Sequence, residues 1–187
     1  MKRIPDAKAA MPPTRTLEHL RLFVNPRERS RGILRAGSLS APAALGARGL
    51  TRFPREGDRA TPAGAFGLME VFYRPDRVQR PRTGLPVRPL READGWCDQP
   101  FHALYNRPVA HPAPVSAEEL WRADHLYDII VVINFNVMPR QQGLGSAIFF
   151  HIARADFAST LGCIAIPEPF MQRILPLCGP RTSLVTG

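Results

Sequence analysis

The sequence predicts a mainly β domain. Its 187 residues include 20 prolines and 14 glycines, which interrupt long helices and favour short strands joined by turns. Short segments of alternating apolar and polar side chains recur along the chain, as in strands with one buried face. With 44% hydrophobic residues, the chain can bury one sizeable core, whereas two full domains would be cramped in this length. We therefore expect a single sandwich-like β domain.

The first predicted strands follow one another closely. Residues 20–24 and 32–36 have alternating or near-alternating apolar positions. Residues 41–45 and 65–73 continue this pattern, and residues 52–64 form a loop punctuated by glycine and proline. We expect these strands to form an antiparallel meander.

Residues 75–114 are the least regular part of the chain. They contain eight prolines, so the segment is either a disordered excursion or a functional loop. Trp96, Cys97 and Tyr105 favour the second option, because disordered segments seldom carry these residue types together. We expect a folded flap beside a cleft, with Trp96 and Tyr105 either lining that cleft or anchoring the flap to the core.

Two short helices and one fully buried strand are predicted. Ser116-Ala117-Glu118-Glu119 matches a capping box, and Leu120-Trp121 would supply the apolar face of a helix. Residues 168–175 place apolar side chains on one stripe, and Pro176 ends the helix. Residues 129–133 are a continuous β-branched run, which is typical of a strand buried on both faces.

These elements set the limits of the predicted domain at residues 20–176, with the flap as an insertion. Residues 1–19 and 177–187 lie outside the periodic segments. We expect them to form a loose N-terminal segment and a C-terminal tail.

The segment from Gly143 to Ile166 places one histidine and one cysteine at the ends of two predicted strands. Residues 146–152 alternate as a strand between two layers does, which puts His151 near the end of a mostly buried strand. Cys163 follows a glycine at the start of the apolar run 164–166. We therefore expect the imidazole to reach the sulfur.

A Cys/His pair is the minimum apparatus for acyl transfer by a thiolate. A free thiol has a pKa of about 8.5, so a neighbouring imidazole must accept its proton or stabilise the anion. Gly162 allows a substrate carbonyl to approach the backbone, whose N–H groups could form an oxyanion hole, and the Thr160 hydroxyl would support the same turn. The alternative is that Cys163 and His151 only pack in the core, since free cysteines are among the most buried residue types.

Two motifs widen this pattern. Glu56 to Phe66 reads EGDRATPAGAF, and Thr160-Leu161-Gly162-Cys163 follows His151. Together they resemble the catalytic domain of the L,D-transpeptidases, the YkuD type, over roughly residues 20–176. In that family the cysteine is the nucleophile and the upstream histidine the proton donor and acceptor, which correspond here to Cys163 and His151. The resemblance also implies a β-sandwich with mixed sheets and one or two short helices.

The sequence departs from the common family signature at two positions. That signature has a second histidine two residues before the cysteine and an arginine or asparagine two residues after it, where this chain has Leu161 and Ala165. Arg154 is the nearest candidate to replace the missing substrate contact.

The resemblance implies a function in cell wall biogenesis. Cys163 would attack the L-centre carbonyl of a peptidoglycan stem tetrapeptide, expel the terminal D-alanine and pass the acyl group to an amine, with no metal or organic cofactor. Two alternatives stay open. Water could be the acceptor, as in an L,D-carboxypeptidase or endopeptidase, or the domain could be a non-catalytic envelope module that binds anionic glycan through its arginines.

The chain is strongly basic, with a formal net charge of +9. Lys2 and Lys8 are its only lysines, so guanidinium groups carry nearly all of the positive charge. The arginines are dispersed and are not interleaved with aromatic side chains that could stack on bases. We therefore expect no specific nucleic-acid binding, and a surface attracted to anionic polymers explains the charge.

The three cysteines, Cys97, Cys163 and Cys178, form neither a CxxC motif nor a zinc-binding spacing. We therefore expect no structural metal, and Cys97 and Cys178 are expected to be buried free thiols.

No apolar run approaches the roughly 20 residues of a membrane span. Residues 1–19 begin with Lys2 and Arg3 but have no apolar stretch behind them, so no signal peptide is visible. The family resemblance nevertheless implies action in the cell envelope or periplasm.

Overall fold

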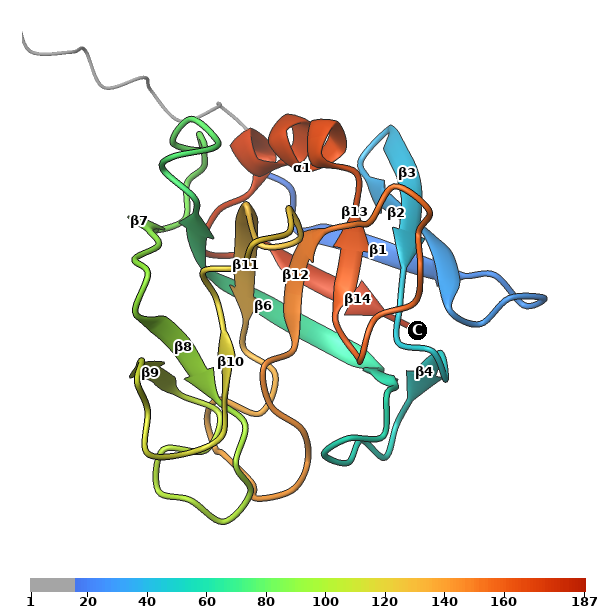
Figure 1. Ribbon diagram of the computed structural model, residues 1–187. Coiled ribbons are helices and arrows are strands. Elements are labelled where there is room, and N and C mark those ends of the chain that lie inside the picture. The colour runs from blue at the N-terminus through green and yellow to red at the C-terminus, as the bar shows by residue number, and fades with distance from the viewer. Residues whose placement is uncertain (1–15) are drawn as a thin grey trace, which may run out of the picture.

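The computed structural model describes residues 16–187, and one mixed sheet of nine strands forms its body (Figure 1). In spatial order the strands are β11 (Ile129–Ile133), β12 (Phe149–Ile152), β13 (Ile164–Ile166), β3 (Leu39–Ala44), β2 (Arg31–Ala36), β1 (His19–Val24), β14 (Ser183–Thr186), β6 (Gly64–Tyr73) and β7 (Val87–Pro89). Strand β6 also pairs with β11, so the sheet closes on itself. The mainly β fold with mixed strand directions is confirmed.

The predicted meander is correct for β1, β2 and β3 and wrong for β6. Strands β1 to β3 are consecutive antiparallel neighbours. Strand β6 has ten residues, of which 64–67 pair with β14 and 68–73 pair with β11. Strand β6 is long enough to pair with β14 and then with β11. It is therefore not a neighbour of β3, because β2, β1 and β14 lie between them in the sheet. A separate pair, β4 (Leu50–Thr51) and β5 (Thr61–Pro62), brackets the loop that β6 follows.

The prediction of a C-terminal tail at residues 177–187 is wrong. Residues 183–186 form β14, which is parallel to β1 and antiparallel to β6. Leu184 is fully buried, so the strand contributes to the core as well as to the sheet. At the other end, β1 already begins at His19, inside the predicted loose segment, and residues 1–15 lie outside the described part of the chain.

Residues 75–114 are folded, but the boundaries differ from the prediction. β7 belongs to the main sheet, whereas β8 (Asp94–Cys97) lies between β9 (Pro108–Ala110) and β10 (Ala117–Glu119) in a small sheet of its own. We call these three strands the side sheet; Figure 1 shows them beside β11.

The predicted helix at residues 116–121 is therefore wrong. Ala117 and Glu119 pair with Cys97 and Gly95 of β8, so the free edge of that strand outweighs the local capping signal. This change matters for the site, because it turns Glu118 toward the cavity described below.

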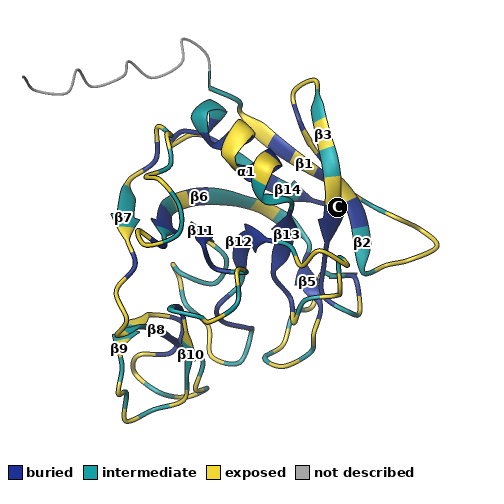
Figure 2. Cartoon of the chain, turned by 45° about the horizontal axis from the view of Figure 1, so that its top comes forward, coloured by how far each residue is buried: buried dark blue, intermediate teal, exposed yellow. Residues whose placement is uncertain are grey.

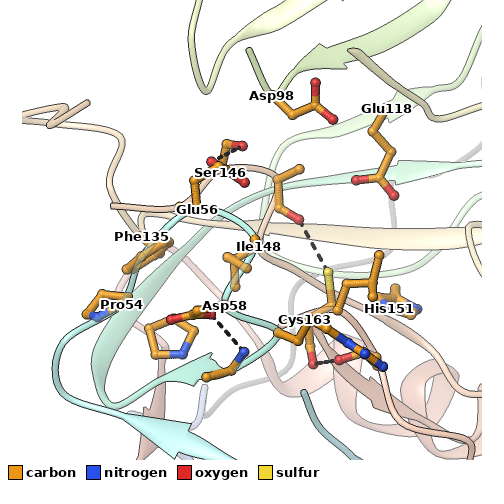
Figure 3. Close-up of a pocket in the computed structure, with 18 of the residues that line it drawn as sticks. Pro54, Glu56, Asp58, Asp98, Glu118, Phe135, Ser146, Ile148, His151 and Cys163 are labelled. Carbon is orange, nitrogen blue, oxygen red and sulfur yellow. Dashed lines mark hydrogen bonds between the residues drawn. The ribbon is translucent and has the colours of Figure 1, made fainter. Parts of the chain in front are cut away.

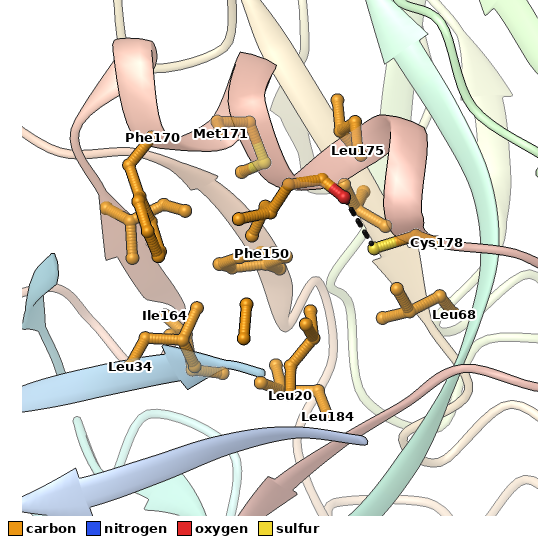
Figure 4. Close-up of a cluster of buried hydrophobic side chains, with 14 of the residues drawn as sticks. Leu20, Leu34, Leu68, Phe150, Ile164, Phe170, Met171, Leu175, Cys178 and Leu184 are labelled. Atoms are coloured by element: carbon orange, nitrogen blue, oxygen red, sulfur yellow. Dashed lines mark hydrogen bonds between the residues drawn. The ribbon is translucent and has the colours of Figure 1, made fainter. Parts of the chain in front are cut away.

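The helix predicted at residues 168–175 is confirmed as α1 (Glu168–Ile174), which continues into the 3₁₀ turn η1 (Leu175–Leu177). Its buried side chains, Phe170, Met171 and Ile174, pack on the main core together with Phe150 and Ile164 (Figure 4). The outward face of α1 is exposed (Figure 2). The helix therefore covers one face of β12 and β13.

Strands β11, β12 and β13 are buried on both faces, as the β-branched run predicted for β11. Phe150 and Ile164 face the main core under α1. Phe149 and Cys163 face the opposite way, into a second apolar cluster with Trp96 of the side sheet. Because side chains alternate along a strand, His151 shares this second face with Phe149. The two candidate catalytic residues thus lie on the face away from the helix.

Candidate active site

A cavity of about 690 Å³ opens on the face of β12 and β13 that carries His151 and Cys163 (Figure 3). Loops at residues 54–60, 144–148 and 158–161 line it, and the side sheet contributes Glu118. The structure therefore brings both residues predicted to carry the chemistry into one cavity.

Cys163 lies just before β13 and is 8% exposed. Its Sγ donates a hydrogen bond to the Ala147 carbonyl at 3.3 Å and accepts one from the Phe149 N–H at 3.4 Å. Burial raises the pKa of the thiol to about 12, and the nearby Glu118 carboxyl adds to this rise. Cys163 is therefore a neutral thiol at neutral pH.

His151 lies in β12 and is also buried. Its Nδ1 is 2.8 Å from the Ile152 carbonyl, to which it donates, so that Nε2 of the neutral ring keeps its lone pair. Burial lowers the pKa of the imidazole to about 4, although the carbonyls of Ile152 and Leu126 favour the charged form. The Tyr127 ring packs edge-on against the imidazole, with ring centroids 5.1 Å apart.

These two pKa values describe a site in which both partners are uncharged. Within residues 16–187, the hydrogen bonds of the sulfur go to backbone groups of Ala147 and Phe149 rather than to His151. A thiolate and imidazolium pair is therefore not the resting form.

The turn before Cys163 is built by Thr160 and Gly162. The Thr160 hydroxyl donates to the Cys163 carbonyl at 2.7 Å and accepts the Gly162 N–H at 3.1 Å. Gly162 has a φ of +143°, and a Cβ there would lie 2.8 Å from Ile148 Cδ1 and 3.0 Å from the Ala60 carbonyl oxygen. Glycine is therefore required for close packing. Its N–H is already bonded to Thr160, so Gly162 does not supply a free donor to an oxyanion hole.

The comparison with protein families identifies the domain. Residues 20–186 match the L,D-transpeptidase catalytic domain, YkuD. The chain belongs to this family. No curated protein and no solved structure matches it in the corresponding searches. The match includes β14, so the L,D-transpeptidase domain extends past the predicted limit at residue 176.

Arg154 lines the cavity of this L,D-transpeptidase domain from the loop after β12. It is exposed, and its charge contributes to lowering the pKa of Asp124, whose main cause is the hydrogen bond from Arg122. A guanidinium is thus available at the cavity wall.

Trp96 and Tyr105, the other candidates for substrate contact, are not among the residues that line the cavity. Trp96 packs edge-on against Phe149 with ring centroids 5.2 Å apart, which is an anchoring role. Tyr105 is fully buried, and its hydroxyl donates to Glu56 and accepts the Gly145 N–H. Of the two roles expected for these side chains, the structure favours anchoring, because their polar groups are already bonded inside the fold.

Several residues at the site were missed from the sequence. Glu118 and Tyr127 line the cavity, and the Tyr127 hydroxyl donates to the Glu118 carboxylate. Burial raises the pKa of both groups. Arg122 also lines the cavity, lies over the Tyr127 ring and forms two hydrogen bonds with Asp124. The capping-box interpretation concealed Glu118, because it placed that residue on a helix surface.

Cys97 and Cys178 are buried free thiols, as predicted. Within residues 16–187, no group of three His, Cys, Asp or Glu side chains is placed to hold a metal ion. The longest helix in this part of the chain has seven residues, so none there could cross a membrane.

Proposed function

We propose that this domain is a peptidoglycan L,D-transpeptidase that acts through a Cys163 acyl-enzyme in cell wall biogenesis. The observation that supports the proposal most is that Cys163 and His151 line one cavity. The Ile152 carbonyl fixes the orientation of the His151 ring through Nδ1. Membership of the family supports the same chemistry.

In the proposed acylation, the Cys163 sulfur attacks the L-centre carbonyl at the third residue of a stem tetrapeptide. His151 Nε2 accepts the thiol proton as the C–S bond forms, which avoids a free thiolate in the buried site. The C–N bond to the terminal D-alanine then breaks, and His151 returns the proton to the leaving amine. The product is a Cys163 thioester.

In the proposed second step, an amine from another stem or a D-amino acid attacks the thioester. His151 accepts a proton from the attacking nitrogen, and the C–S bond breaks. That proton returns to the sulfur, so the neutral thiol is restored. Because stem peptides lie outside the cytoplasmic membrane, we place this activity in the cell envelope.

Intact-mass measurement after incubation with a tetrapeptide tests the proposal. We expect an adduct of the acyl tripeptide on Cys163 with release of D-alanine. Adding a competing amine should then yield the transfer product. Release of free tripeptide in place of a transfer product would assign water as the acceptor. An unmodified protein and an unchanged peptide would refute the proposed chemistry.

A further inference from the structure

Ala147 holds a strained backbone conformation beside the nucleophile. Its φ is +50°, in the left-handed region that residues with a Cβ rarely adopt. In this conformation its carbonyl accepts the Sγ–H of Cys163. Because a left-handed residue interrupts an extended strand, β12 begins at Phe149 and not at residue 146 as predicted. A strained residue persists only where its surroundings hold it.

Asn106 supplies those surroundings. Its Oδ1 accepts the Ala147 N–H at 3.1 Å and the Trp96 indole N–H at 2.8 Å. Its Nδ2 donates to the carbonyls of Phe135 and Asn136 at 3.3 and 2.8 Å. The residue is 4% exposed and has a left-handed φ of +52° itself. One buried amide thus joins the side sheet, the 135–136 loop and Ala147.

We propose that Asn106 is a positioning residue for the nucleophile: by holding Ala147 in its left-handed conformation, it keeps the Ala147 carbonyl on the thiol proton of Cys163. Its part in turnover rests on the proposed function. When His151 takes that proton and the sulfur forms a thioester, Sγ has nothing left to donate. The Ala147 carbonyl is then free to accept an N–H of the bound peptide.

The hydrogen bond from Cys163 to the Ala147 carbonyl affects the pKa of the thiol. A carbonyl that accepts the S–H stabilises the protonated thiol, whereas the Phe149 N–H stabilises the thiolate. Other groups face the sulfur from the surrounding elements: Glu118 on β10, Arg122 and Tyr127 before β11, and His151 on β12. Substitution at Asn106 leaves all of these side chains in the chain, so a change in thiol reactivity would not come from the loss of any one of them.

The test is the rate of iodoacetamide labelling of each cysteine as a function of pH, in the wild type and in Asn106→Gly. Glycine tolerates the left-handed backbone and removes the side chain, together with its hydrogen bonds to Ala147, Trp96 and the 135–136 loop. We expect the labelling midpoint of Cys163 to fall by about one pH unit, as for the loss of one hydrogen bond. We expect kcat/KM for the tetrapeptide to fall roughly tenfold.

Cys97 and Cys178 are internal controls, because general loosening would expose them too. Asn106→Asp keeps oxygen acceptors for Ala147 and Trp96, and its charge opposes a fall, so its Cys163 midpoint should not drop. Asn134→Ala is the matched control: Asn134 accepts the Gly67 N–H in the neighbouring loop and should leave the midpoint unchanged.

An unchanged Cys163 midpoint in folded Asn106→Gly would overturn the inference, as would equal acceleration of all three cysteines. If that variant does not fold, hydrogen exchange in the wild type decides. The Ala147 N–H should exchange as slowly as the β12 amides, and fast exchange refutes the contact. Labelling uses no peptide, so a shifted midpoint without turnover would refute only the proposed function. Turnover with an unshifted midpoint would refute only the positioning role.

Discussion

Ala165 lies directly beside His151 in the parallel pairing of β13 with β12, and both residues line the cavity. The common family signature has an arginine or asparagine at the position of Ala165. The methyl group there leaves the imidazole without a polar neighbour from β13. Under the proposed function, a contact to the carboxylate of the stem peptide would therefore come from another element of the cavity wall.

Arg154 is the expected source of that contact. In Arg154→Ala, kcat/KM for the tetrapeptide should fall about tenfold to a hundredfold, the effect of losing a charge-assisted hydrogen bond. Iodoacetamide labelling of Cys163 should stay unchanged, because the small reagent does not need the guanidinium. Arg173→Ala, on the exposed side of α1, is the control and should keep full activity. Equal kinetics in the two variants would leave Arg154 without a role in binding.

Cys163→Ala should abolish turnover while the melting temperature stays close to that of the wild type, since the substitution removes one sulfur at the cavity wall. Cys97→Ala should retain activity, because that thiol is buried away from the cavity. Peptide turnover and thermal denaturation measure both results. Turnover by Cys163→Ala would exclude the acyl-enzyme route.

His151 should make stability pH-dependent. The pKa of its imidazole is about 4 in the fold, against 6.5 in the unfolded chain. Between these values the unfolded state binds a proton that the folded state does not, so stability falls as pH decreases from 6.5 to 4. The loss should be about 3 kcal/mol. Urea unfolding of the wild type and His151→Gln should differ in this slope, and parallel profiles would contradict the buried neutral imidazole.

Glu118→Gln should make the thiol more acidic. The Glu118 carboxylate faces Cys163 and raises its pKa, whereas a glutamine keeps an oxygen for the Tyr127 hydroxyl but carries no charge. The midpoint of Cys163 alkylation should therefore move to lower pH. Glu119→Gln is the matched control, since Glu119 is the exposed neighbour on the same strand. The same midpoint in both variants would mean that Glu118 is already protonated.

Gly162→Ala should destabilise the fold by about 1–3 kcal/mol, because its φ of +143° and the close approach of Ile148 and Ala60 leave no room for a methyl group. Gly143→Ala is the comparison: its φ is +76°, but nothing lies within 4 Å of the added Cβ. The difference in melting temperature isolates the steric part. A smaller loss for Gly162→Ala than for Gly143→Ala would contradict the packing described here.

Local patterns predicted the parts of the fold that depend on neighbours in sequence. The alternation of β1 and β2, the β-branched run of β11 and the apolar stripe of α1 each reflect burial along a single element. Cys163 and His151 could also be predicted from local patterns, because each lies in or next to a short apolar strand that is recognisable in the sequence.

The remaining features depend on partners far away in the chain. Residues 117–119 became a strand because β8 offered an edge, and residues 183–186 did so because β1 and β6 lie on either side. Asn106 acquires its contacts from Trp96, Ala147 and the 135–136 loop. No local sequence motif predicts these contacts between residues that are far apart in the chain.

The position of β14 has a consequence for synthesis of the protein. His19 of β1 pairs with Ser183, and the opposite edge of β14 pairs with β6. A growing polypeptide therefore cannot complete this sheet until residues 183–186 have left the ribosome. During translation β1 and β6 each have an unpaired edge, which is a template for association with other chains. Such distant pairing also slows folding. The nascent domain therefore stays exposed to aggregation until β14 has left the ribosome.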